Sequence, residues 1–477
     1  MIRSSLCAGF LALASAALVA PAAFAQTPAP ATAPAAATDF DGDWWGVVTA
    51  GGHSLRLGFK IHAGGKSTLE SPDQGARGLE LSAVKIDGDS VHLEFAPGRL
   101  VYEGKRGADK DTLEGRVLQG ATATPLTLHR GSEPAAVAEA RKPRPQEPTK
   151  PYPYRSEDVA YENTAEHVHL AGTLTVPEGK GPFPTVLLIT GSGAQDRDET
   201  LLGHKPFLVL SDYLTRRGVA VLRVDDRGIG GSSGDFLNST TGDFATDVEA
   251  GLAYLRTRPE VDKRHIGLIG HSEGGIIAPM VAARDPGVSF IVMMAGSGVP
   301  GRDIFLYQQE QAFLAAGVPQ TKVDQIMAGR RKLYAILASS ADNATALKQV
   351  GDLLADEAVA QGAPPERGRA VAFQFAGPWG RYFANYDPAV DLKRLHIPVL
   401  AINGSKDTQV DPTLNLPPIR AALANDRQAT VMELPGLNHL FQPANTGQLA
   451  EYQTIETTID PSVLALIGDW VVKHTRR

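Results

Sequence analysis

Hydrophobic and polar residues alternate in short segments near the start of the chain. Residues 55–61 place Leu, Leu, Phe and Ile at every second position, with Arg, Gly and Lys between them. A period of two is typical of a strand that buries one face. Residues 91–95 repeat the pattern shortly after Asp87-Gly88, a dipeptide favoured in hairpin turns. Short strands separated by glycine-containing turns predict a small all-β domain, a barrel or a sandwich, over residues 39–131.

A different pattern begins after Tyr154. Strand-like apolar runs alternate with helix-length segments, and the runs are residues 185–190, 219–225, 266–270, 290–295 and 399–403. This alternation predicts an α/β fold, a doubly wound and mostly parallel sheet covered by helices on both faces. In such folds the functional loops follow the carboxyl ends of the parallel strands.

A long insertion interrupts this alternation. About 100 residues separate Gly296 from the next strand-like run at Val399, far more than one crossover helix needs. Apolar residues recur in it at helical spacing, as at Phe305, Ala312, Phe313, Ala316, Val323, Ile326, Met327, Tyr334 and Leu337. We therefore expect a helical cap at about residues 300–388 that covers the site and excludes water. Trp379 and Phe383, near its end, are candidate substrate-binding residues.

The remaining segments have the composition of leaders and linkers. Residues 1–25 combine Arg3, an apolar run and the small-residue pattern Ala23-Phe24-Ala25, which together predict a secretory signal peptide. We expect an exported protein, periplasmic or secreted, without stable membrane insertion. Two linkers are also predicted, an Ala/Pro-rich one at 26–38 and a Pro-rich one at 132–154.

Composition narrows the functional classes. The chain has 477 residues, which predicts more than one domain, and a formal charge of −7, which disfavours nucleic acid as a partner. Its single cysteine, Cys7, excludes a disulfide framework and a thiolate metal cluster. No metal or other cofactor is expected.

The motif that carries chemistry is Gly270-His271-Ser272-Glu273-Gly274, a G-x-S-x-G pentapeptide. It stands between the apolar run 266–270 and a segment rich in small residues, so the serine lies between a strand and a helix. A nucleophile at such a turn needs glycines where two backbones approach closely. The start of the helix adds a partial positive charge where an oxyanion would develop. We expect His271 to pack and not to catalyse.

With this motif the chain resembles the α/β-hydrolase superfamily, from about Glu157 to Lys473. Thr190-Gly191-Ser192-Gly193 matches the turn that forms half of the oxyanion hole, although Thr190 stands where histidine is usual. Asp225 to Gly230 matches a structural D-x-R-G-x-G loop, with Arg227 expected to tie it together. The resemblance is strongest to exported bacterial serine esterases related to the prolyl oligopeptidase and acylaminoacyl peptidase branch. It implies an oxyanion hole built from the backbone N–H groups of Glu273 and of Ser192 or Gly193.

The resemblance also implies the order serine, acid, histidine. Asp407 follows the strand-like run 399–403 and is the expected acid. Asp411 is its competitor, but it precedes a proline and a helical run, as a helix N-cap does. His439 is the expected base, because it lies on a loop after the acid, whereas His474 lies in the last predicted helix.

Together these features predict a hydrolase domain at residues 155–477 that cleaves carboxylic esters of small molecules, with short or medium acyl chains, through an acyl-enzyme. One alternative is a serine peptidase of the prolyl oligopeptidase or acylaminoacyl peptidase type. Such enzymes usually carry a β-propeller, for which residues 39–131 are too few. A second alternative is a non-catalytic binding protein on a hydrolase fold. The sequence sets no oligomeric state.

Overall fold

A computed structural model describes residues 39–50, 53–62, 65–72, 76–95, 100–119, 122–134, 144–360 and 362–475. The predicted signal peptide and the first linker lie outside these residues. The chain divides into two compact units, one with residues up to 142 and 341–376, the other with 143–340 and 377–477. The division falls inside the predicted second linker. We expected one cap at 300–388 within the hydrolase domain, whereas residues 341–376 of that segment group with the first unit.

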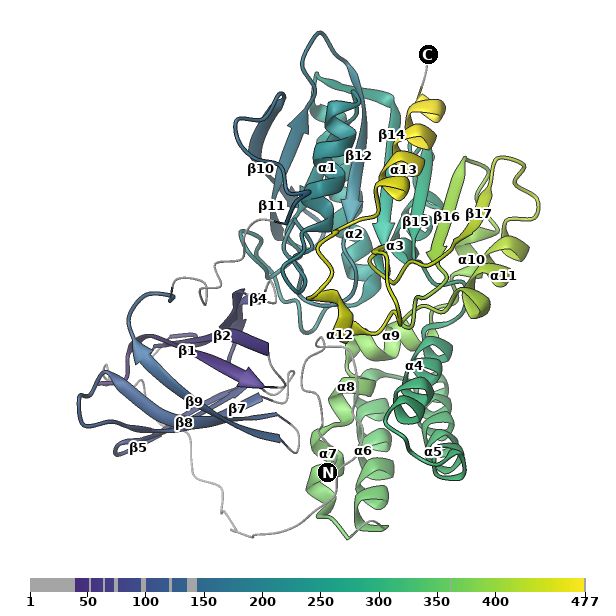
Figure 1. Ribbon diagram of the computed structural model, residues 1–477. Coiled ribbons are helices and arrows are strands. Elements are labelled where there is room, and N and C mark those ends of the chain that lie inside the picture. The colour runs from purple at the N-terminus through teal and green to yellow at the C-terminus, as the bar shows by residue number, and fades with distance from the viewer. Residues whose placement is uncertain are drawn as a thin grey trace. The chain divides into compact units, whose positions relative to one another are not determined.

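In the described part of the first unit, nine strands form one antiparallel sheet (Figure 1). The strands are β1 (Gly42–Ala50), β2 (His53–Ile61), β3 (Thr68–Ser71), β4 (Ala76–Glu80), β5 (Ala83–Asp87), β6 (Ser90–Phe95), β7 (Leu100–Arg106), β8 (Thr112–Gln119) and β9 (Thr122–Arg130). Their order in the sheet is β4-β3-β2-β1-β9-β8-β7-β6-β5. The edge strands β4 and β5 are therefore consecutive in the chain.

This order requires the sheet to roll up, since only Leu81 and Ser82 join its two edges. Phe59 on β2 and Tyr102 on β7 show the consequence. The two strands are not neighbours in the sheet, yet their fully buried rings lie 5.5 Å apart between centroids. The Tyr102 hydroxyl donates a hydrogen bond to the backbone oxygen of Leu113 at 2.8 Å. Of the two architectures expected, the pairing corresponds to a rolled, barrel-like sheet around an aromatic core.

The second unit contains the α/β sheet. Its strands are β10 (Arg155–Asn163), β11 (Val168–Val176), β12 (Phe183–Ile189), β13 (Ala220–Val224), β14 (Val261–His271), β15 (Phe290–Met294), β16 (Val399–Gly404) and β17 (Thr430–Leu434). The sheet order is β10-β11-β13-β12-β14-β15-β16-β17. β11 pairs antiparallel with both β10 and β13, and the six strands β12 to β17 run parallel to one another, as the fold class predicts.

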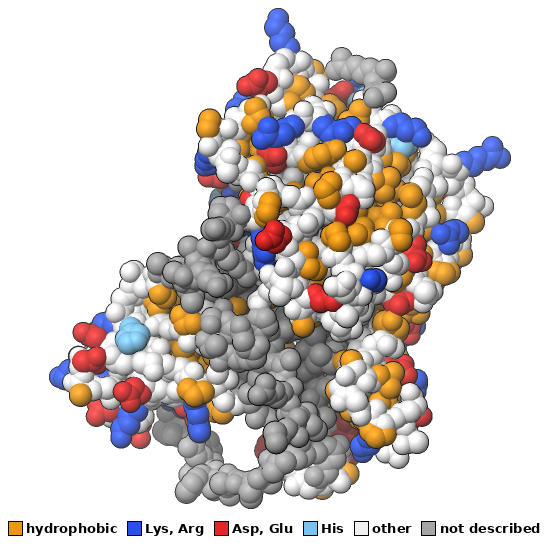
Figure 2. Space-filling model, in the orientation of Figure 1, with side chains coloured by type: hydrophobic (Ala, Val, Ile, Leu, Met, Phe, Trp, Pro, Cys, Tyr) orange, Lys and Arg blue, Asp and Glu red, His pale blue; other side chains and the backbone are white. Residues whose placement is uncertain are grey.

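Helices cover both faces of this sheet because alternate strand residues point to opposite sides. On β12, Leu187 packs in one core and Leu188 in the other. The first core includes α2 (Thr241–Thr257), α3 (Gly274–Ala282), α10 (Ala389–Leu392) and α11 (Pro412–Ala422); the second includes α1 (Pro206–Arg216) and α13 (Pro461–Thr475). α12 (Leu449–Tyr452) precedes α13. On the face that Figure 2 shows, acidic and basic side chains of this unit are interspersed with apolar ones.

The insertion between β15 and β16 is helical, as predicted. Its members are α4 (Gly301–Ala315), α5 (Gln320–Ser339), α6 (Asn343–Ala360), α7 (Pro365–Ala370), α8 (Ala372–Ala376), α9 (Pro378–Asn385) and α10. In the second unit, α4, α5 and α9 pack on one another, while in the first unit α6 packs on α7 and α8. Among the described residues, no helix has both the length and the apolar character needed to span a bilayer.

Candidate active site

Ser272 lies at a sharp turn between β14 and α3. Its φ of 54° is in the left-handed region, which non-glycine residues rarely adopt and which marks backbone strain at functional sites. The backbone N–H of Ser272 donates to Met294 O at 2.8 Å and fixes the turn against β15. The motif glycines are required by close approach. A Cβ on Gly270 would lie 1.9 Å from Gly274 O, and one on Gly274 would lie 2.1 Å from Ile189 O.

The turn after β12 lies directly against the serine. A Cβ on Gly191 would approach the Cβ of Ser272 to 3.2 Å. Within the described part of the protein, the backbone N–H groups of Ser192, Gly193 and Glu273 have no hydrogen-bond acceptor. Unpaired N–H groups at a helix start and a neighbouring turn can stabilise an oxyanion. These are the three residues that the sequence predicts for the oxyanion hole.

Asp407 and His439 form a buried hydrogen-bonded pair. His439 Nδ1 lies 2.7 Å from Asp407 Oδ2, and the residues are 4% and 2% exposed. The other oxygen, Asp407 Oδ1, accepts the backbone N–H groups of Gln409 and Val410, both at 2.8 Å. A carboxylate fixed in this way selects the tautomer that carries the proton on Nδ1, which leaves Nε2 free to act as a base.

The competing residues serve other purposes. Asp411 is the N-cap of α11, where its Oδ1 accepts the backbone N–H groups of Thr413 at 2.8 Å and Leu414 at 3.1 Å. His474 bonds through Nδ1 to the backbone oxygen of Trp470, one turn earlier in α13. The structure therefore brings Asp407, and not Asp411, to His439.

Within the described ranges, Ser272 is linked to Asp407 and His439 through its neighbour His271 and not by a hydrogen bond of its own. Among the described residues, its hydroxyl makes no hydrogen bond with His439. The ring of His271, the residue before the serine, lies 4.7 Å from the ring of His439 between centroids. Catalytic hydrogen bonds are often long without substrate and tighten when it binds.

His271 does more than pack. Its Nδ1 lies 2.8 Å from Glu199 Oε1, and its Nε2 lies 3.0 Å from the backbone oxygen of His439. Glu199 Oε1 also accepts the backbone N–H of Gly191 at 2.7 Å. Sequence reasoning missed Glu199, because it lies 72 residues before His271 and no motif spacing joins the two.

Glu273 directs its side chain into the protein, where it is 3% exposed. Its Oε1 accepts hydrogen bonds from the hydroxyl of Thr241 at 2.7 Å and from the indole Nε1 of Trp379 at 2.9 Å. Burial raises the pKa of Glu273, which favours its neutral form. The residue after the serine thus anchors the predicted substrate-binding residue Trp379.

Trp379 belongs to an aromatic cluster of the helical insertion. Its ring stacks on Phe383, 5.0 Å away between centroids, and meets Phe305 edge-on at 5.8 Å. Phe383 is only 7% exposed and also lies against Phe305 at 5.2 Å. Trp379 is half-buried and Phe383 belongs to the interior of the cluster, so Trp379 is the better placed of the two to meet a substrate.

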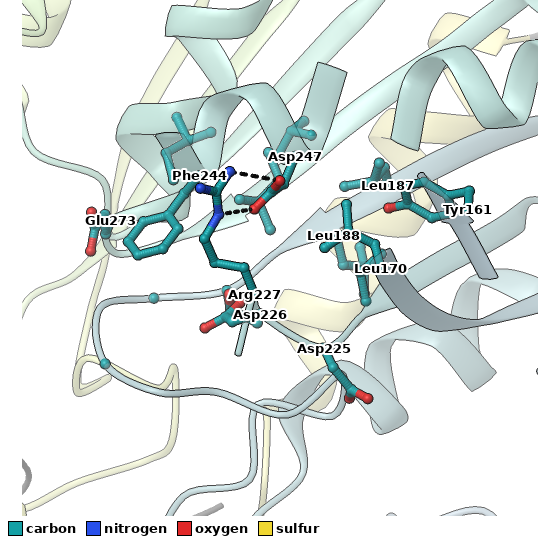
Figure 3. Close-up of a pocket in the computed structure, with 17 residues that line it drawn as sticks. Tyr161, Leu170, Leu187, Leu188, Asp225, Asp226, Arg227, Phe244, Asp247 and Glu273 are labelled. Atoms are coloured by element: carbon teal, nitrogen blue, oxygen red, sulfur yellow. Dashed lines mark hydrogen bonds and ion pairs between the residues drawn. The ribbon is translucent and has the colours of Figure 1, made fainter. Parts of the chain in front are cut away.

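A cavity of about 50 Å³ lies beside this site (Figure 3). Gly191, Gly193, Asp226, Arg227 and Glu273 are among its lining residues. Arg227, expected to tie its loop together, instead fixes the loop to α2 through a buried ion pair with Asp247 at 2.7 Å. Burial raises the pKa of Asp226 well above its usual value. Of the carboxyl groups that line this cavity, Asp226 and Glu273 are the ones whose neutral form is favoured by burial.

Strand order, nucleophile turn and insertion together define the α/β-hydrolase fold. The model of the X-Pro dipeptidyl-peptidase (S15) family matches residues 166–416, more than half of the chain. The chain belongs to this family.

Several relatives carry the name esterase. The chain is 26% identical over 310 residues to esterase EstD of Thermotoga maritima, covering 64% of this chain and 66% of that one. It is 30% identical over 117 residues to esterase FrsA of Klebsiella pneumoniae, covering 24% and 26%. The match thus spans less than two thirds of either relative. Among solved structures, the Pyrococcus furiosus esterase Pf2001 is 17% identical, with 68% of this chain and 92% of that one covered and a TM-score of 0.41.

Proposed function

We propose that this protein is a serine hydrolase that cleaves carboxylic esters of small molecules. The observation that carries the proposal is the buried Asp407–His439 pair, which the ring of His271 links to the turn that holds Ser272 in strained backbone. The esterase names of the relatives support an ester rather than another acyl compound as the substrate.

The proposed reaction follows from these positions. The Ser272 oxygen attacks the ester carbonyl while His439 Nε2 takes its proton, and Asp407 stabilises the imidazolium that forms. The N–H groups of Glu273 and of Ser192 or Gly193 hold the negative oxygen of the tetrahedral intermediate. His439 then gives its proton to the leaving alcohol. Water attacks the acyl-enzyme by the same route, releasing the acid and restoring Ser272.

We further propose that Trp379 borders the acyl-binding region. Its indole is anchored to Glu273, adjacent to the nucleophile, and its ring is part of an aromatic cluster. An aromatic wall this close to the serine favours short or medium acyl chains.

The test uses the purified protein and its Ser272→Ala variant with p-nitrophenyl esters of increasing acyl length. We expect ester turnover that falls roughly 10⁴–10⁶-fold in the variant. Undiminished turnover in Ser272→Ala would refute the site, and the chain-length profile would report the size of the acyl region.

A peptidase activity is the second candidate, favoured by the family description. X-Pro and N-acylaminoacyl anilides in the same assay distinguish the two. Anilide turnover comparable to ester turnover would replace the esterase proposal, whereas ester turnover alone would support it.

We also propose export, from the pattern of residues 1–25. Fractionation of cells that produce the full chain would find the protein in the periplasm or medium, shortened at its N-terminus. Retention of the full-length chain in the cytoplasm would contradict the proposal.

A further inference from the structure

His271 lies between two groups that can only accept hydrogen bonds. One is the carboxylate of Glu199, 2.8 Å from Nδ1, and the other is the backbone oxygen of His439, 3.0 Å from Nε2. Both interactions are buried, with His271 5% and Glu199 3% exposed. A neutral imidazole has one N–H, so it can donate to only one of these acceptors. With Glu199 ionised, both contacts require a proton on each ring nitrogen, and His271 is then an imidazolium.

The contacts of this pair reach three loops of the site. Glu199 Oε1 accepts the N–H of Gly191, which begins the oxyanion turn. His271 itself precedes Ser272 in the nucleophile turn. The carbonyl that His271 holds belongs to His439, the proposed base. One buried ion pair therefore links the backbones that carry the oxyanion donors, the nucleophile and the base.

We propose that Glu199 and a permanently protonated His271 form a positioning pair that fixes the His439 loop and the Gly191 turn relative to Ser272. Neither residue touches the reacting atoms; both act through the backbone of others. The inference rests on the proposed ester hydrolysis for its kinetic consequences, but the charge on His271 can be observed without any substrate.

Electrostatics supports a charged pair. The titratable groups that act on His271 are Glu199, His439 and, more weakly, Asp407. Burial alone would favour the neutral ring, but the Glu199 carboxylate outweighs it and raises the pKa of His271 above its usual value. Because the two charges cancel, the pair can stand beside His439 without strongly opposing the imidazolium that forms there during catalysis.

Glu199→Gln is the sharpest test, because it keeps size and shape but removes the negative charge. Without that charge, the buried His271 loses its second proton. The amide oxygen stays on the Gly191 N–H and also accepts from His271 Nδ1–H, so the neutral ring points its Nε2 lone pair at the His439 carbonyl. We expect kcat to fall about 10–100-fold through misplacement of the base, with KM changed by less than about 3-fold.

The chain offers a matched control. His265 and Asp262 form a similar pair at 3.0 Å, on the same strand β14 but at its opposite end. Asp262→Asn removes a carboxylate from a histidine in the same way, and we expect kcat to remain within about 3-fold of wild type.

A second variant tests the charge. His271→Gln leaves the Glu199 carboxylate without its cation. In the wild-type protein that cation lies close to the proposed base, with 4.7 Å between the centroids of the His271 and His439 rings. The uncompensated negative charge favours the imidazolium form of the base beside it, so the acidic limb of kcat/KM should move to higher pH by roughly 0.5–2 units. A residue with only a packing role would lower activity without moving this limb.

The outcomes separate the two proposals. Three results would support the positioning pair. The first is a loss of kcat in Glu199→Gln that exceeds the loss in the control, and the second is a shifted acidic limb in His271→Gln. The third is a set of ¹⁵N shifts that shows two protonated ring nitrogens on His271 at neutral pH. Wild-type-like kinetics in both variants, or a neutral His271 by NMR, would overturn it. Absence of Ser272-dependent ester turnover in wild type would instead refute the proposed function, and the NMR measurement would still decide the charge.

Discussion

His439 Nδ1 lies 2.7 Å from Asp407 Oδ2, while the second oxygen of the same carboxylate is held by two backbone N–H groups. The carboxylate can therefore neither rotate nor exchange its two oxygens without losing hydrogen bonds in a buried place. Its orientation, and with it the tautomer of the imidazole, is set by the backbone of the loop after β16.

This arrangement predicts the effect of Asp407→Asn. The amide oxygen would stay with the N–H groups of Gln409 and Val410, and the amide NH₂ would face His439 Nδ1. The ring would then carry its proton on Nε2, where it cannot accept one from Ser272. We expect kcat to fall by about 10⁴-fold with little loss of folding stability, measured by ester turnover and thermal unfolding.

The matched control is Asp411→Asn, four residues along. Asn caps a helix as well as Asp does, so α11 should persist and turnover should stay near wild type. Equal losses in the two variants would contradict the assignment of Asp407 as the acid.

Gly274→Ala should be strongly destabilising. The new Cβ would lie 2.1 Å from the backbone oxygen of Ile189, and backbone cannot move aside as a flexible side chain can. We expect a loss of about 1–3 kcal/mol in the free energy of unfolding. Gly351→Ala in α6 is the comparison, because its Cβ would find the nearest atom at 3.7 Å. It should stabilise its helix by up to about 1 kcal/mol, and denaturant unfolding would measure both.

Stability should depend on pH through Asp225. Burial alone would raise the pKa of Asp225, but the Arg197 guanidinium at 2.7 Å and backbone N–H donors lower it below the usual 3.8. A carboxyl whose folded pKa is depressed stabilises the fold above its unfolded pKa and loses that contribution as pH falls through the folded value. Asp225→Asn should therefore cost about 3 kcal/mol at neutral pH and flatten the loss of stability below about pH 4.

Asp158 provides the control for this prediction. It also pairs with Arg197, at 3.1 Å, but its side chain is 89% exposed. Asp158→Asn should change stability by less than about 1 kcal/mol. A similar cost for both variants, in urea titrations at neutral and acidic pH, would be inconsistent with burial as the cause.

Glu273→Gln should be well tolerated. Its carboxyl accepts hydrogen bonds from Thr241 and Trp379 through one oxygen, and burial raises its pKa, so an amide oxygen in the same place reproduces these contacts. We expect turnover within about 5-fold of wild type, since at most about one hydrogen bond is affected. Glu273→Ala leaves the donors of Thr241 and Trp379 unpaired and should lose more in both turnover and melting temperature. Equal effects of the two substitutions would argue against the hydrogen bonds.

The sequence predicted the elements whose pattern is local. The run 290–295 corresponds to β15 (Phe290–Met294), and 399–403 to β16 (Val399–Gly404), because fully buried parallel strands are continuous apolar runs. The antiparallel strand β10 was not predicted. β10 has mostly exposed or half-buried positions, and so lacks that signal.

Long-range relations were harder to predict than strands. Ser272 and Asp411 could be interpreted from neighbouring residues, as a nucleophile turn and an N-cap. The partnership of Glu199 with His271, and of Glu273 with Trp379, depends on how distant loops fold together. No periodicity or motif encodes such contacts. The grouping of residues 341–376 with the first unit is of the same kind, since their helical spacing predicts helices but not their neighbours.

The bond from Trp379 to Glu273 connects α9 of the helical insertion to the residue that follows the proposed nucleophile. α9 carries the tryptophan, and the glutamate supplies one of the proposed oxyanion donors from its own backbone. A displacement of α9 away from Glu273 must break this bond or pull on the residue next to the proposed nucleophile. Redesign of α9 for bulkier esters should therefore alter turnover together with selectivity, unless Glu273 receives a new donor in place of the indole.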